Sequence, residues 1–105
     1  MEKLEKFILY VGLNDKDTKT QKVNTIDAYN IVNNILLAHV EGATITQANG
    51  IYKHNNGNFT TENTFIIELL FTDKATVETI CNELKRILNQ ESIAIQKQIM
   101  ESYLY

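Results

Sequence analysis

Two short stretches, FILYV at residues 7–11 and FIIELLF at residues 65–71, carry apolar side chains at almost every position. Side chains of a strand alternate between its two faces, so a continuous apolar run predicts a strand that is apolar on both faces. A chain of 105 residues has room for only one layer of helices, which covers one face of a sheet. We therefore expect a second copy of the protein to cover the other face, with a ligand cleft between copies. The apolar tail at residues 102–105 is also expected to pack, on its own subunit or on a neighbour.

The pattern around these stretches predicts four strands and two helices in one domain that spans residues 1–105. The strands are expected at about residues 6–13, 43–54 and 61–71 and from residue 92 onward, and the helices at about residues 25–39 and 74–88. Two strand–helix–strand units joined by a hairpin are typical of the α+β ferredoxin-like βαββαβ sandwich. This fold has a four-stranded antiparallel sheet with two helices on one face. The two apolar strands are expected at its centre, and the polar second and fourth strands at its edges.

Cap and turn residues support these boundaries. Asn24 and Asp73 precede the helical patterns and are expected as N-caps. Gly42 and Asn89 follow the helices, where a left-handed residue often ends a helix. Gly50 lies inside the second predicted strand, where a glycine suggests a bulge or a close backbone approach.

Composition excludes several classes of partner. The net charge is −3 and the only arginine is Arg86, so DNA and RNA are not expected to bind. A single cysteine, Cys81, excludes an intrachain disulfide and a zinc site built from cysteines. The first six residues lack the apolar core of a signal peptide, and no segment predicts a membrane span, so a cytoplasmic location is expected. The absence of proline and the many Asn, Ile and Lys residues suggest a bacterium of low GC content or its phage.

Polar residues after the first strand and around the hairpin turn at residues 55–58 form the candidate ligand site. At the end of the second strand, Lys53 or His54 could meet a negative charge, and these side chains are expected to face Glu62 and Asn63 across the hairpin. Plain pairing on the surface is the alternative. The candidate ligand-binding residues are Asn14, Asp15, Lys16, Tyr52, Lys53, His54, Glu62 and Asn63.

Other polar residues are interpreted as structural. Asp15 and Asp17 alternate in a loop, but no third acidic ligand follows at the spacing of a metal loop, so a solvated turn is favoured. His39 at a helix end and Cys81 on an apolar helical stripe are expected to serve packing. No catalytic triad, nucleophile elbow or phosphate loop is present. We therefore expect no catalytic residue, metal or cofactor, although His54 and Glu62 could act as an acid–base pair.

The run LYVGLNDKD at residues 9–17, with GATIT at residues 42–46 and GIY at residues 50–52, resembles the nitrogen-regulatory PII-like proteins. The motifs ENT at residues 62–64 and LNQES at residues 88–92 are similar to small proteins of Firmicutes and their phages. The resemblance implies a trimer of ferredoxin-like subunits that binds nucleotides or other small anions in clefts between subunits. The expected loop at residues 55–60 is shorter than the regulatory loop of PII proteins and lacks their basic cluster, which argues against nitrogen signalling.

These observations lead to three hypotheses. The first is a non-catalytic, cytoplasmic homo-oligomer, a trimer rather than a dimer, that binds a small nucleotide-type or other anionic ligand between subunits. In a phage, such a protein could sequester a nucleotide immune signal of the host, because sequestration needs only affinity and copy number. The second is a protein-interaction module or anti-defence inhibitor, and the third is a small ferredoxin-fold enzyme.

Overall fold

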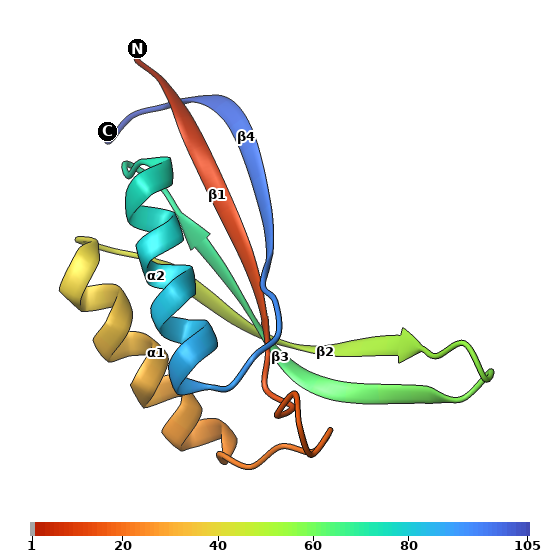
Figure 1. Ribbon diagram of the computed structural model, residues 1–105. Helices are drawn as coiled ribbons and strands as arrows, with labels where there is room; N and C mark the ends of the chain where they lie inside the picture. Colours follow the sequence, from red (N-terminus) through yellow and green to blue (C-terminus); the bar gives the residue numbers. More distant parts are fainter. Residues whose placement is uncertain (1) are drawn as a thin grey trace.

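The computed structural model describes residues 2–105 of the chain (Figure 1). The elements are, in chain order, β1 (Glu2–Gly12), α1 (Thr25–His39), β2 (Thr44–Lys53), β3 (Phe59–Leu69), α2 (Lys74–Ile87) and β4 (Ala94–Ser102). The strands form one antiparallel sheet in the order β2-β3-β1-β4, and both helices lie on the same face of it. The predicted ferredoxin-like βαββαβ sandwich is confirmed, with the two apolar strands at its centre.

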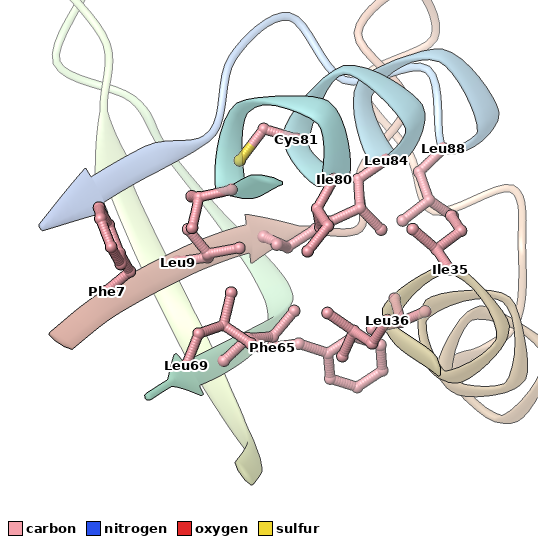
Figure 2. Packing of buried hydrophobic residues seen from close by; sticks show 14 of the residues in the cluster. Phe7, Leu9, Ile35, Leu36, Phe65, Leu69, Ile80, Cys81, Leu84 and Leu88 are labelled. Carbon is pink, nitrogen blue, oxygen red and sulfur yellow. The ribbon is translucent and has the colours of Figure 1, made fainter. Parts of the chain in front are cut away.

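The core lies between the two central strands and the helices (Figure 2). Leu9 of β1 lies opposite Ile67 of β3, and Val11 lies opposite Phe65, so these side chains share one face of the sheet. All four are at most 1 % exposed. The helices contribute their apolar stripes to the same layer, at Ala28, Val32, Ile35 and Leu36 of α1 and at Val77, Ile80, Cys81 and Leu84 of α2.

The opposite face of the sheet is free of helices and less apolar than the sequence predicts. Its central side chains are Ile8 and Tyr10 of β1 and Ile66 of β3, all partly exposed. Leu70 and Phe71 do not extend it, because β3 ends at Leu69 and the chain turns toward α2, with Phe71 in the left-handed region at φ 58°. The prediction that this strand extends to residue 71 is therefore wrong.

The helix ends agree with the sequence at three of four positions. Asn24 and Asp73 are the N-caps, and their side chains accept backbone hydrogen bonds of 2.9 and 2.8 Å. Asn89 adopts the left-handed conformation after α2, with φ 49°. The predicted role of Gly42 is wrong, because α1 ends at His39, its C-cap Val40 is extended, and Gly42 does not have a positive φ. No helix among residues 2–105 is long and apolar enough to cross a membrane.

The β2–β3 hairpin extends beyond the helices as an arm (Figure 1). Its turn contains Gly57 at φ 87°, a conformation that favours glycine, as the sequence predicts. Ile51 and Phe59 on the arm are 72 % and 68 % exposed because no helix reaches them. The pairing continues through Gly50 without a bulge, and the group that a Cβ there would meet, at 3.1 Å, is the side-chain Oγ1 of Thr64 rather than a backbone, so both readings of this glycine are wrong.

The end of the chain does not pack on its own subunit. Tyr103 and Leu104 follow β4 and are 61 % and 88 % exposed, and Tyr105 is fully exposed. The prediction that the tail packs on its own subunit is therefore wrong. Packing on a neighbouring subunit stays a prediction.

We expect Ile67→Ala to lower the free energy of unfolding by about 3 kcal/mol, because it leaves a cavity at a fully buried position. Urea unfolding followed by circular dichroism measures this loss. Ile26→Ala is the matched control, since Ile26 is 75 % exposed and its replacement should change the stability by less than about 0.5 kcal/mol. Equal effects of the two substitutions would contradict the assignment of the core.

Candidate functional site

A cleft of about 470 Å³ lies where three segments meet on the helix-free face. The segments are the loop after β1, the inner part of the β2–β3 arm and the turn between α2 and β4. This volume is within the range of small-molecule sites. The lining residues are Tyr10, Gly12, Asn14, Asp15, Lys16, Lys19, Tyr52, His54, Thr60, Glu62, Gln90, Glu91, Ser92 and Ala94.

Glu62 of β3 is the partly buried carboxylate of this cleft. The backbone N–H of Asn14 donates a hydrogen bond of 2.9 Å to its Oε2 atom. Gly12 makes room for it, because a Cβ at this position would overlap the carboxylate of Glu62. The hydrogen bond from Asn14 and the space beside Gly12 therefore fix the carboxylate of Glu62 at a defined place in the cleft.

Tyr52 of β2 lies beside this carboxylate. Partial burial raises the pKa of its phenol, and the neighbouring carboxylate of Glu62 raises it further. The hydroxyl of Tyr52 therefore stays protonated at neutral pH and can donate a hydrogen bond to Glu62 or to a ligand. The aromatic ring is about half exposed and offers an apolar surface at the same point.

The loop after β1 is held by Asp15. Its Oδ1 atom accepts backbone hydrogen bonds from Asp17 and Thr18, at 2.9 and 3.0 Å, and its Oδ2 atom accepts one from the side chain of Asn89 at 2.9 Å. The bond from Asn89 is the largest cause that lowers the pKa of Asp15, to about 2. These bonds confirm a turn, but Asp15 is buried at 8 % exposure and only Asp17 is exposed, so the prediction of a solvated turn is wrong for Asp15. Among residues 5–105, no three His, Cys, Asp or Glu side chains gather closely enough to hold a metal ion.

The turn after α2 forms a wall of the cleft that sequence analysis interpreted as a cap and turn only. Gln90 is 8 % exposed, and its Nε2 atom donates a hydrogen bond of 2.7 Å to the backbone oxygen of Asn14. The backbone N–H of Lys16 donates to the backbone oxygen of Asn89 at 3.0 Å. Nothing in the local sequence indicates these contacts, because they join residues more than 70 positions apart.

The structure brings six of the eight candidate residues to the cleft and excludes two. Lys53 and Asn63 lie on the other face of the arm, because neighbouring side chains of a strand alternate. The side chain of Asn63 donates instead to Gln21, at 2.8 Å. Ligand binding by the six that line the cleft stays a prediction; they are Asn14, Asp15, Lys16, Tyr52, His54 and Glu62.

The acid–base pair that His54 and Glu62 could form is not present. Nε2 of His54 lies 2.6 Å from the hydroxyl of Thr60, while Glu62 is bound by Asn14. In the register of the hairpin, Glu62 lies opposite Gly50, several residues from the turn, so the two side chains occupy different parts of the cleft.

Two other titratable residues serve the packing of the helices. Cys81 is 6 % exposed, and burial raises the pKa of its thiol to about 11, so it is not a reactive nucleophile. Nε2 of His39 lies 3.0 Å from Oε2 of Glu83 and joins α1 to α2. Both observations agree with the structural roles that the sequence predicts.

Comparison with solved structures places the fold among known proteins. A phage SAM lyase in complex with S-methyl-5'-thioadenosine has a TM-score of 0.67 and 22 % identity, over 95 % of this chain and 87 % of that chain. CutA from Archaeoglobus fulgidus, a periplasmic divalent cation tolerance protein, has a TM-score of 0.62 and 12 % identity, over 94 % and 87 %. CutA1 from Oryza sativa has a TM-score of 0.60 and 12 % identity, over 97 % and 85 %. No curated protein sequence matches the chain significantly.

The fold and the cleft define a small ferredoxin-like protein with a ligand-sized cleft on the open face of its sheet. The chain belongs to the family described as protein of unknown function, DUF3574, which matches residues 6–102. The predicted PII-like fold is confirmed, whereas origin from Firmicutes or a phage and the cytoplasmic location stay predictions. The prediction of a non-catalytic protein is corrected, because a protein of the same fold is a SAM lyase, an enzyme. Missing catalytic motifs therefore do not argue against catalysis here.

We expect the stability of the protein to fall as the pH drops from about 4 to about 2. The pKa of Asp15 is lower in the folded state than its usual value of 3.8, so its stabilising effect is present above pH 4 and is lost as the carboxylate is protonated. Thermal unfolding of the wild type and of Asp15→Asn should show a higher Tm for the wild type at pH 7 and a gap that narrows below pH 4. A gap that is constant over this range would contradict the role of the ionised carboxylate.

Proposed function

We propose that the protein is an enzyme of the SAM lyase type, which binds a nucleoside sulfonium in the cleft and cleaves one of its carbon–sulfur bonds. The observation that carries the proposal is the carboxylate of Glu62, held by Asn14 and adjacent to the phenol of Tyr52. A fixed negative charge in a partly buried cleft favours a positively charged ligand group. A sulfonium is such a group, and it cannot lose its charge by deprotonation.

The size and the aromatic side chains of the cleft suit a nucleoside. Tyr52 presents a half-exposed ring, and Tyr10 lines the same space while its hydroxyl donates to Gln96 at 3.0 Å. Bases stack on aromatic side chains of this kind. Polar side chains of His54, Thr60 and Ser92 complete the lining and offer hydrogen bonds to a sugar.

The charges of the lining do not favour a simple anion. Three acidic residues and two lysines border the cleft: Asp15, Glu62, Glu91, Lys16 and Lys19. A ligand that carries charges of both signs fits this set better than the anionic ligand expected from the sequence. S-adenosylmethionine combines a sulfonium with the ammonium and carboxylate of an amino acid.

The shared fold supports the reaction type by analogy. The phage SAM lyase was solved with S-methyl-5'-thioadenosine, the neutral thioether that remains when the sulfonium loses its amino-acid chain. When that carbon–sulfur bond breaks, the electron pair stays on sulfur. The carbon takes its new electron pair from the carboxylate oxygen of the same substrate, so a carbon–oxygen bond closes a lactone as the carbon–sulfur bond breaks, and no water is added. Glu62 would hold the cationic substrate, and Tyr52 would orient it.

We also propose that the helix-free faces of several copies meet and that a neighbouring subunit borders the cleft. The partly exposed Ile8, Tyr10 and Ile66 lie on this face, and Tyr10 also lines the cleft. Burial of such side chains between copies stabilises an oligomer. The resemblance to PII-like proteins favours a trimer.

The wild-type protein should convert S-adenosylmethionine to S-methyl-5'-thioadenosine, which reversed-phase chromatography separates. We expect Glu62→Gln to lower kcat/KM by about 100-fold, the scale of one electrostatic group in an active site. Tyr52→Phe should lower it by about tenfold, the effect of one hydrogen bond. Glu78→Gln on the exposed side of α2 is the matched control and should leave the rate unchanged. Binding without turnover would contradict the lyase reaction, and no binding would overturn the whole proposal.

Native mass spectrometry should give a mass close to three times the 12.0 kDa of one chain. Ile66→Lys is expected to dissociate the oligomer, because it would place a charge among apolar side chains of the interface. Ile26→Lys, on the exposed side of α1, is the control and should leave the mass unchanged. A monomeric wild type, or a trimer with Ile66→Lys, would show that this face is not the interface.

A further inference from the structure

Lys16 and Lys19 are exposed side chains that border the cleft. The ion pairs found among residues 5–105 involve other basic residues, at Lys6, His39, Lys74 and Lys97. Within the described part of the chain, the two cleft lysines therefore have no carboxylate partner. Two positive charges at the edge of a ligand-sized cleft are available to an anionic group of the ligand.

The backbone of the loop holds both lysines in place. The N–H of Lys16 donates to the backbone oxygen of Asn89 at 3.0 Å, and the N–H of Lys19 donates to that of Asp15 at 2.8 Å. Lys19 has a φ of 62°, a left-handed conformation that is uncommon for a residue with a side chain. Asp15 stabilises this turn through the bonds described above. Such a fixed backbone reduces the entropy lost when a lysine binds a ligand.

The acidic residues of the cleft form no ion pair with these lysines and have other contacts or positions. Asp15 uses both carboxylate oxygens within the loop and toward Asn89. Glu91 is exposed on the turn before β4. Glu62 belongs to β3, on the arm side of the cleft, so the lining has a negative group on the strand and two positive groups on the loop.

We infer that Lys16 and Lys19 bind the carboxylate of the ligand's amino-acid part while its sulfonium lies near Glu62. This inference rests on the proposed function and names the group by which the site would select its substrate. In S-adenosylmethionine, the sulfonium and the carboxylate lie at opposite ends of one short aliphatic chain. The lysines would then discriminate between this molecule and its decarboxylated analogue, which keeps the nucleoside and the sulfonium.

Isothermal titration calorimetry with S-adenosylmethionine and with decarboxylated S-adenosylmethionine tests this inference. The wild type should bind the first ligand more tightly. The double variant Lys16→Met/Lys19→Met should lose about tenfold or more in affinity for S-adenosylmethionine, as for other hydrogen bonds between charged groups. Its affinity for the decarboxylated ligand should not fall, because that ligand has no carboxylate for the lysines to bind and its positive charges are repelled by them.

Lys74→Met/Lys85→Met on α2 is the matched control, since it removes the same net charge away from the cleft. It should bind both ligands as the wild type does. If the variant at positions 16 and 19 loses affinity for both ligands equally, or for neither, the inference is overturned while the proposed function stands. If the wild type binds neither ligand, the proposed function fails and this inference fails with it.

Discussion

The structure depends on the one-sided burial of its two central strands. Leu9 and Ile67 lie opposite each other in β1 and β3, and they are fully buried because both helices cover that face. The alternation of side chains then sends Tyr10, Gly12 and Glu62 to the uncovered face. The same register that closes the core therefore brings the polar groups of the cleft together.

In the cleft, contacts of a few single residues fix the position of one carboxylate. A partly buried carboxylate costs free energy unless hydrogen bonds or solvent compensate it. Glu62 is compensated by the N–H of Asn14 and has its space because residue 12 is a glycine. Gln90 in turn holds Asn14 through its backbone oxygen. Four residues from three separate segments thus define the position of one charge.

The fold itself does not decide the function. SAM lyase and CutA proteins share this architecture with the chain at low sequence identity, and they are named for different activities. What distinguishes one such protein from another is the set of side chains in the cleft. In this chain the set combines Glu62 and Tyr52 with the lysines of the loop after β1, and our proposals depend on that combination.

The sequence by itself determined the order of the elements, the central position of the apolar strands and the N-caps, because periodicity and capping are local properties. It also located six of the polar residues that line the cleft, since these follow a strand or flank a turn. Only the tertiary structure decided which face of each strand the helices cover, and this excluded Lys53 and Asn63 from the cleft. It also decided that Gln90 and Gly12 belong to the site. Both outcomes depend on pairing and packing between distant segments, about which a local pattern contains no information.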